Sequence, residues 1–415
     1  MNELRDENEK LRRILDVSLR MASPMALDDL LHVIVDAVCD VLACERATIF
    51  LYDAESDELV SRVARGVDEI RVPATEGIVG VAAQHRRIVN IADAYADSRF
   101  NQEVDKRTGY HTRNLLTLPL ENLEGELIGV LQALNKVEDV FHVDDEELAR
   151  VFAAQAGVAL DRGRLIEAYA EKRRMERDLQ IARRIQQDLL PKDNPEVAGF
   201  EIAGWNRSAD ETGGDTYDFM RLEDGSLAVV LADATGHGIG AALIIAQFRS
   251  ILRSLLTVTT DLRLIAGRLN NLLSEDLADN RFVTAFIGIL DPQKREMSYI
   301  AAGQGPLLMV KGPSDVEMRY ASAPPLAVIP DYAYGAPERF DFPSGATLAL
   351  LTDGFFEASN EVNDQFGERR IIDAIRRYWN APPAKMITDL YADISTFTGA
   401  APQADDLTAL IVRGA

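Results

Sequence analysis

Four short acidic motifs in the C-terminal half of the chain contain residues suited to chemistry. They are Gly213-Gly214-Asp215-Thr216-Tyr217-Asp218, Asp233-Ala234-Thr235-Gly236-His237-Gly238, Thr352-Asp353-Gly354 and Asp405-Asp406-Leu407-Thr408. Each adjoins an apolar run that predicts a strand, and the runs before Asp233 and Asp353 predict central strands. A carboxylate at such a strand end is costly to bury unless a cation compensates its charge.

No equally placed Lys or Arg accompanies these acids, so the sequence predicts divalent cations at the four motifs. Oxygen ligands without a Cys/His set favour Mg²⁺ or Mn²⁺ over zinc. Several converging carboxylates indicate two ions, which roughly 3.5–4 Å apart can share a water, lower its pKa and present hydroxide to a phosphorus atom. The predicted chemistry is hydrolysis of a phosphomonoester.

A simpler interpretation is that these aspartates only form turns and helix caps, because Asp-Gly is a common turn dipeptide. Asp353-Gly354 on its own favours that interpretation, and Asp224-Gly225 is predicted to be a hairpin turn between two strands. The four motifs together favour the metal site because of the family resemblance that they carry.

The elements that must position these motifs begin at Phe200, where the pattern changes to many short strands. Strands are predicted at 201–209, 215–222, 226–233, 282–290, 297–303, 306–311, 346–352 and 407–413. Helices are predicted at about 239–256, 261–277, 367–379 and 386–397. This order predicts two sheets with helices outside.

In order and spacing, the four motifs resemble those of the metal-dependent PPM protein phosphatases, specifically the SpoIIE-like bacterial branch, over residues 190–415. The resemblance includes the helix at 179–191, Phe282-Val283-Thr284-Ala285-Phe286, Ala302-Gly303 and the segment 351–358. It implies an αββα β-sandwich. It also implies a phosphoserine or phosphothreonine protein as substrate, often an anti-sigma-factor antagonist.

The resemblance also implies roles for individual residues. Asp233 would bridge two Mn²⁺ or Mg²⁺ ions, the backbone carbonyl of Ala234 would join one ion, and Asp353 and Asp405 would complete the pair of sites. Asp215 would hold metal-bound water. Asp406 and Asp218 would ligate an ion or orient a ligand or its water, and His237 would either donate a proton to the leaving oxygen or have a backbone or packing role.

Two positions depart from the family pattern. Gln304 stands where the family often has histidine, and Thr212 stands where valine is common. Neither departure removes a metal ligand, so we expect an active enzyme in which Gln304 alters substrate preference or rate.

The N-terminal half is predicted to form an α+β domain over residues 25–165. A helix is predicted over 27–42 and another near 78–85, with strands at 47–52, 59–64, 88–91, 115–120 and 127–134. Asp144 followed by Glu147 predicts a capping box that starts a long helix.

This order of elements resembles a GAF domain, a fold that holds small ligands between its sheet and its helices. Five residues resemble the signature of cyclic-nucleotide-binding GAF domains, namely Asn135, Lys136, Phe141, Asp145 and Glu146. The segments 98–101 and 108–116 resemble the corresponding segments of phosphodiesterase GAF domains. The resemblance implies cAMP or cGMP as a regulatory ligand, with the signature bracing the pocket more than touching the ligand.

The phosphate group of such a ligand is expected to bind the backbone N–H groups at the start of a helix. Gly77 is the candidate for that helix start. Arg99 and Arg113 are cationic candidates, with surface solvation as the alternative for both. A redox or light sensor is the other sensory interpretation, but Cys39 and Cys44 offer no anchoring motif and are predicted to be buried free thiols.

Heptad-like spacing of Met175, Leu179, Ala182, Gln186 and Leu189 predicts a linker helix over 166–191 that pairs with its copy in a homodimer. Similar spacing predicts a short coiled-coil helix within residues 1–24. The phosphatase domain is then predicted over 192–415. Ligand binding in the sensor is expected to act on it through the linker helix.

Charge and length exclude several other classes. Forty-four basic against 67 acidic residues give a net charge of −23, which argues against nucleic acid or an anionic membrane as partner. The charged N-terminus and the lack of an apolar run near ~18 residues predict a cytoplasmic protein. Two alternatives to a ligand-regulated protein phosphatase are a catalytically silent phosphatase fold that binds a partner, and a small-molecule phosphohydrolase.

Overall fold

The computed structural model describes residues 15–63, 70–278, 280–312 and 315–415. The chain divides into two compact units, Met1–Arg174 and Met175–Ala415, and each is described by itself. The domain boundaries predicted above at 165/166 and 191/192 lie on either side of this division and stay a prediction.

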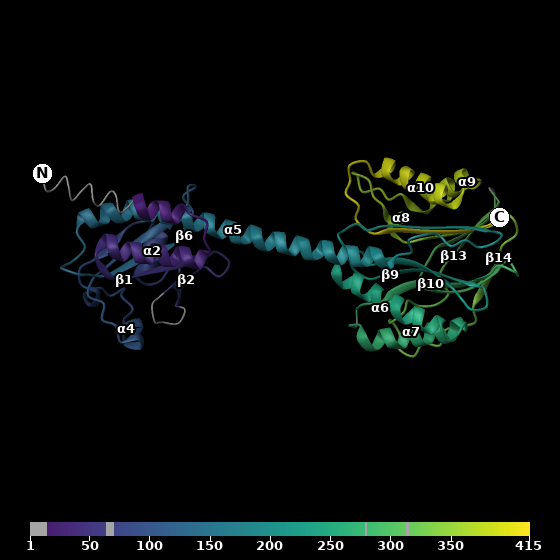
Figure 1. Cartoon of the computed structure of the whole chain (residues 1–415), viewed down its shortest axis with the longest axis horizontal. Coiled ribbons are helices and arrows are strands. Elements are labelled where there is room, and N and C mark those ends of the chain that lie inside the picture. The colour runs from purple at the N-terminus through teal and green to yellow at the C-terminus, as the bar shows by residue number, and fades with distance from the viewer. Residues whose placement is uncertain (1–14, 64–69, 279, 313–314) are drawn as a thin grey trace. The chain divides into compact units, whose positions relative to one another are not determined.

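The N-terminal unit is built on a six-stranded antiparallel sheet in the order β3-β2-β1-β6-β5-β4 (Figure 1). The strands are β1 (Cys44–Asp53), β2 (Glu58–Val63), β3 (Arg71–Pro73), β4 (Val89–Ile91), β5 (Leu115–Glu121) and β6 (Leu127–Lys136). The helices are α2 (Leu27–Leu42), α3 (Gly77–His85), the 3₁₀ helix η1 (Ala94–Ala96), α4 (Gln102–Thr108) and the first part of α5 (Val143–Leu189).

Alternation along β1 explains why helices cover both faces of this sheet. Ile49 and Leu51 point into a core that they share with α2 and α5, whereas Phe50 points into a second core beneath α3. Successive side chains of a strand face opposite sides, so an apolar run in β1 indicates burial on both faces.

The start of α5 corrects the predicted capping box. The helix begins at Val143, so Asp144 lies inside its first turn rather than at the cap. The side chain of Asp145 instead accepts a hydrogen bond from the backbone N–H of His142, at 2.9 Å. The carboxylate therefore satisfies one of the free N–H groups that a helix start leaves.

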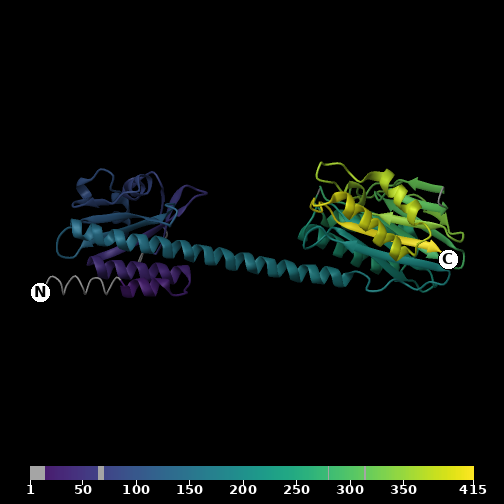
Figure 2. The same ribbon diagram turned by 90° about the horizontal axis from the view of Figure 1, so that it is seen from above.

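The predicted coiled-coil helix of residues 1–24 falls partly outside the described residues, because these begin at residue 15. Residues 15–22 are helical and lie beside α5 (Figure 2). Arg162 of α5 donates to the backbone carbonyls of Met21 (2.6 Å) and Ala22 (3.1 Å), and Val17 is buried in the core next to α2 and α5.

The C-terminal unit has two five-stranded antiparallel sheets, ordered β14-β11-β10-β9-β8 and β13-β12-β15-β16-β7. The strands are β7 (Phe200–Arg207), β8 (Asp215–Arg221), β9 (Leu227–Ala234), β10 (Val283–Asp291), β11 (Glu296–Ala302), β12 (Leu307–Gly312), β13 (Asp315–Arg319), β14 (Glu338–Asp341), β15 (Thr347–Leu351) and β16 (Leu407–Gly414). An aromatic-rich core that includes Phe286, Tyr299 and Phe340 lies between the sheets.

Helices cover the outer faces of both sheets. The first sheet packs against α6 (Ile239–Leu256) and α7 (Leu262–Asp276), and the second against α8 (Gly354–Glu357), α9 (Gly367–Tyr378) and α10 (Pro383–Thr398) (Figure 1). This αββα arrangement confirms the predicted α+β fold class with its β-sandwich.

Helix α6 corrects the prediction that no apolar stretch reaches the length of a membrane span. Among the described residues, it is the one helix long and apolar enough by length and composition. Ile244, Phe248 and Leu252 are buried against the first sheet. Packing in a protein core accounts for the apolar character of this helix.

Candidate functional site

The predicted carboxylates converge where the central strands of the two sheets end. Asp215 at the start of β8 and Asp233 near the end of β9 are register partners in the first sheet. Asp353 follows β15 and Asp405 precedes β16 in the second sheet. The pKa of Asp233 is raised first by burial and then by the charges of Asp215, Asp353 and Asp405, which places all four carboxylates in one cluster.

Asp215 connects the two sheets. Its side chain is buried and accepts hydrogen bonds from the hydroxyls of Thr408 (2.6 Å) and Thr352 (2.8 Å), both of the second sheet. Burial raises the pKa of Asp215, while the two hydroxyl donors lower it. The threonines therefore favour the ionised form that a metal ligand needs.

The cluster has the chemistry of a divalent-cation site. Burial raises the pKa values of Asp353 and Asp405, and the charges of neighbouring carboxylates add to the rise. Throughout the described part of the chain, no three His, Cys, Asp or Glu side chains are placed to hold one ion by themselves. Mg²⁺ is usually bound through one or two carboxylates and keeps several waters.

Replacing Thr408 with valine removes one donor to Asp215 with little change in volume. We expect Mn²⁺ affinity to fall about 10-fold to 100-fold, the usual effect of losing a group that orients a metal ligand. The measurement is the Mn²⁺ concentration that gives half of the maximal thermal shift. Thr396→Val on α10, whose hydroxyl donates only to Ala392 O, is the matched control. Equal affinities in the two variants would contradict the role of Thr408.

Asp406 has a different role from the four carboxylates of the cluster. Its buried carboxylate accepts the backbone N–H groups of Ala209 (2.8 Å) and Asp215 (3.3 Å). A Cβ on Gly213 would lie 2.0 Å from Asp406 Oδ2, so glycine is required where the loop passes this carboxylate. Asp406 thus fastens the loop before β8, which fits the orienting role that we left open for it better than metal ligation.

Asp218 is the one acid of the four motifs that points to the other face of its strand. It forms ion pairs with Arg253 (2.6 Å) and Arg249 (3.0 Å) of α6. Asp215 and Asp218 are three positions apart, so they face opposite sides of β8. The expectation that Asp218 orients a metal ligand is therefore wrong, and its role is to attach α6 to the sheet.

His237 and Ala234 lie in the loop that follows Asp233. The side chain of His237 is 88% exposed, and its Nδ1 lies 3.1 Å from Asp210 Oδ2, so a packing role does not apply. The backbone carbonyl of Ala234 faces the loop before β8, because a Cβ on Gly214 would lie 2.7 Å from it.

The two departures from the family pattern have structural explanations. Gln304 is buried, donates to Leu351 O (3.0 Å) and is hydrogen-bonded to the hydroxyl of Thr284 (3.1 Å). Thr284 is the register partner of Asp233, so Gln304 joins the two sheets behind the cluster. Thr212 is buried, and its hydroxyl has no hydrogen-bond partner among the described residues, which is why valine suits this position.

Gln186 of α5 is a residue whose role sequence reasoning missed. Its side-chain amide donates to Gly213 O (2.5 Å) and accepts from Gly213 N (3.0 Å). Gly213 lies two residues before Asp215, so the end of α5 holds the loop that presents a cluster carboxylate. The heptad spacing assigned Gln186 to a helix interface instead.

A cavity of about 830 Å³ lies in the N-terminal unit, a volume typical of small-molecule sites. Two of the predicted ligand residues line it, Gly77 and Arg99, as do Ser98, Phe100 and Asn101. Arg99 is already paired with Asp97, at 2.6 Å. Arg113 and the five signature residues are not among those that line the cavity.

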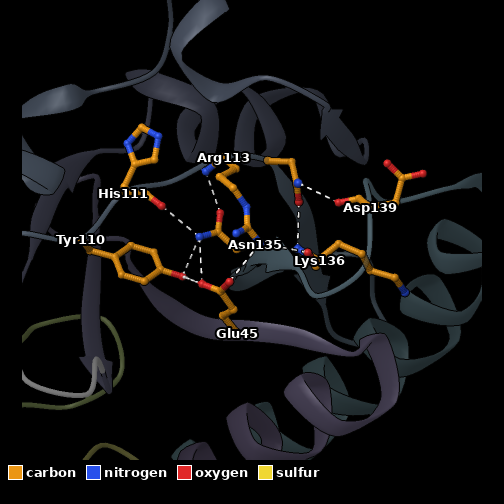
Figure 3. Close-up of polar contacts among 8 residues, drawn as sticks. Glu45, Tyr110, His111, Arg113, Asn135, Lys136 and Asp139 are labelled. Atoms are coloured by element: carbon orange, nitrogen blue, oxygen red, sulfur yellow. Dashed lines mark hydrogen bonds and ion pairs between the residues drawn. The ribbon is translucent and has the colours of Figure 1, made fainter.

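The signature residue Asn135 instead connects elements behind the cavity wall (Figure 3). It donates to Glu45 (3.0 Å), Tyr110 (3.0 Å) and His111 O (2.9 Å), and it accepts from the backbone N–H of Arg113 (2.6 Å). Glu45 and Tyr110 both line the cavity. Asn135 therefore positions two wall residues without facing a ligand.

The remaining signature residues attach β6 to α5. Lys136 pairs with Asp145 at 2.7 Å and donates to Leu42 O, and Glu146 accepts from Asn90 (2.9 Å). Phe141 is buried, with the Lys136 ammonium 5.9 Å from the centre of its ring. These contacts match the bracing role that the resemblance implied.

The fold and the site define a class for each unit: a sandwich with the fold of PP2C phosphatases, and an α+β unit with a cavity of small-molecule size. Residues 223–414 match the family model described as Stage II sporulation protein E (SpoIIE), and residues 26–160 match the GAF domain. The chain thus joins a GAF-type domain to a SpoIIE-type domain.

Solved structures and curated relatives each resemble a part of the chain. The SiaA-PP2C domain of Pseudomonas aeruginosa is 21% identical, with a TM-score of 0.52 over 59% of this chain and 98% of that one. The dual 3′,5′-cyclic-AMP and -GMP phosphodiesterase 11A of Takifugu rubripes is 33% identical over 40% of this chain and 20% of its own length. The probable 3′,5′-cyclic phosphodiesterase pde-5 of Caenorhabditis elegans is 31% identical over 38% of this chain and 23% of its own. This chain spans about a fifth of these two relatives.

Proposed function

We propose that this protein hydrolyses phosphoserine or phosphothreonine on a regulatory protein, and that a small molecule in the GAF domain controls the reaction. The observation that carries the proposal is the cluster of Asp215, Asp233, Asp353 and Asp405 at the facing strand ends of two sheets. Burial and mutual repulsion raise the pKa of Asp233, and divalent cations would relieve both.

In this proposal the four carboxylates and the Ala234 carbonyl would hold two Mn²⁺ or Mg²⁺ ions, and such ions would supply a water of lowered pKa as the nucleophile for a phosphate ester. Thr352 and Thr408 favour the ionised form of Asp215 through their hydroxyl donors. His237 protonates the leaving oxygen of serine or threonine, with Asp210 orienting its ring.

A cyclic nucleotide is the ligand that we propose for the cavity. The two curated relatives described above are cyclic-nucleotide phosphodiesterases, and the N-terminal unit carries the GAF match. The lining combines arginines for phosphate with Phe50 and Phe100 as apolar surfaces for a base. The arginines of the lining are Arg20, Arg46 and Arg99.

We also propose an anti-sigma-factor antagonist as the type of substrate, a cytoplasmic location and a homodimer. The dimer is supported by apolar side chains on α5 that are exposed in a single chain, namely Met175, Ile181 and Ile185. A second copy of α5 would bury them. The SpoIIE-type match supports the type of substrate.

The test is Mn²⁺-dependent hydrolysis of a phosphoserine peptide and of p-nitrophenyl phosphate by the full chain, each with and without cAMP or cGMP. We expect metal-dependent turnover that a nucleotide changes. Inactivity towards both substrates and a phosphoprotein would favour the catalytically silent fold. Faster turnover of small phosphate esters than of peptide would favour a small-molecule phosphohydrolase, and indifference to both nucleotides would reject them as ligands.

A further inference from the structure

Arg281 lies beside the loop that follows Asp233. Its neighbour Phe282 donates its backbone N–H to the hydroxyl of Thr235 (3.1 Å), and Phe282 O accepts from Thr235 N (3.0 Å). Thr235 is two residues after Asp233. These two hydrogen bonds hold the segment before β10 against the cluster loop, so the position of Arg281 is fixed relative to that loop.

The guanidinium of Arg281 lies over the first turn of α6. A Cβ on Gly240 would lie 3.0 Å from Nη1 and 3.4 Å from Nη2 of Arg281, so a glycine leaves room for the guanidinium there. The next residue of α6, Ala241, lies beside Gly214. A Cβ on Gly214 would lie 3.3 Å from the Ala241 side chain. Gly214 directly precedes Asp215, so the guanidinium and the residue before Asp215 both lie next to the first turn of α6.

The guanidinium of Arg281 has no charged partner among the residues that the structure describes. Within residues 15–63, 70–278, 280–312 and 315–415, its guanidinium makes no hydrogen bond and no ion pair, although its side chain is exposed. By contrast, Arg249 and Arg253 of the adjacent helix both pair with Asp218. The first turn of α6 adds the positive end of a helix dipole.

We propose that Arg281 binds the phosphoryl group of the substrate at the entrance to the carboxylate cluster. The inference rests on the proposed phosphatase function and adds a substrate-binding residue to it. A guanidinium presents a planar fork of N–H donors that matches two phosphoryl oxygens. It stays protonated throughout, so it binds and orients the dianion and transfers no proton.

The experiment measures binding of inorganic phosphate to the full-length, Mn²⁺-loaded protein by calorimetry, together with steady-state kinetics on a phosphoserine peptide. For Arg281→Ala we expect phosphate affinity to fall about 10-fold to 100-fold, the range for losing a charge-assisted hydrogen-bonded pair. The KM for the peptide rises by a similar factor, and kcat changes less. Arg281→Lys keeps the charge without the fork, so it restores only part of the affinity.

Arg268→Ala is the matched control, because Arg268 is an exposed arginine of α7 with no ion pair within the same described residues. Its phosphate affinity should equal that of the wild type, and Mn²⁺ affinity should be unchanged in all three variants. Wild-type phosphate affinity in Arg281→Ala would overturn the inference even if the enzyme is active. Arg281-dependent phosphate binding without any hydrolysis would support the binding role and reject the phosphatase function instead.

Discussion

Asp233→Asn should abolish metal-dependent hydrolysis of both phosphopeptide and p-nitrophenyl phosphate while leaving the protein folded. We expect kcat to fall by at least about 1,000-fold, because the metal ions contribute several kcal/mol of transition-state stabilisation. The amide has the shape of the carboxylate but no charge to hold a cation. The measurement is the initial rate at saturating Mn²⁺.

The same variant should be more stable than the wild type when metal is absent. The pKa of Asp233 is raised to about 10 in the folded protein, so at neutral pH folding without metal requires a carboxylate that is ionised in the unfolded chain to take up a proton, and the neutral amide removes that cost. Thermal unfolding in EDTA should show a higher midpoint, and adding Mn²⁺ should raise it less than in the wild type. Asp224→Asn, in the hairpin turn where Asp224 accepts from Ser226 N, is the control. A metal shift equal to that of the wild type would contradict the assignment of Asp233.

Gln186→Ala should lower activity about 10-fold to 100-fold without removing any group from the carboxylate cluster. It deletes both hydrogen bonds to Gly213, each of which contributes about 0.5–1.5 kcal/mol net. The loop before β8 would then sample positions in which Asp215 no longer faces Asp233. We expect the loss mainly in Mn²⁺ affinity and kcat, measured by titrating the metal at saturating substrate.

Gln187→Ala is the matched control for this prediction, since the neighbouring glutamine is exposed and its side chain makes no hydrogen bond within the described residues. Gln186→Glu tests the geometry further, because a carboxylate can accept from Gly213 N but cannot donate to Gly213 O. If Gln186→Ala and Gln187→Ala have the same kinetics, then the end of α5 does not control the loop.

The core of the fold was predictable because buried strands are apolar throughout. The strands that carry the cluster, β9 and β15, have continuous apolar runs, and the aspartates stand at their ends. The edge strands β13 and β14 were not predicted, because their sequences, Asp-Val-Glu-Met-Arg and Glu-Arg-Phe-Asp, are mostly charged. Hydrogen bonding to a single neighbouring strand forms them, and that depends on tertiary context.

The site was predictable to the level of the motif but not always to the level of the side chain. The opposite directions of Asp215 and Asp218 follow from strand periodicity, which could have separated them. Nothing local distinguishes the ligand candidate Asp405 from the loop-fastening Asp406, because the distinction depends on contacts with the distant Ala209 and Asp215. The role of Gln186 was hidden for the same reason, since helical spacing does not say which polar side chain meets another segment.

The amide of Gln304 has a consequence for how the enzyme responds to acidity. This amide joins Thr284 to Leu351. Thr284 is the register partner of Asp233, and Leu351 lies two residues before Asp353, so the amide sets the separation of carboxylates that come from different sheets. A histidine, which often stands at this position in the family, gains a proton near neutral pH and then loses its ability to accept a hydrogen bond. An amide does not titrate, so this hydrogen-bonded connection between the two sheets does not depend on pH.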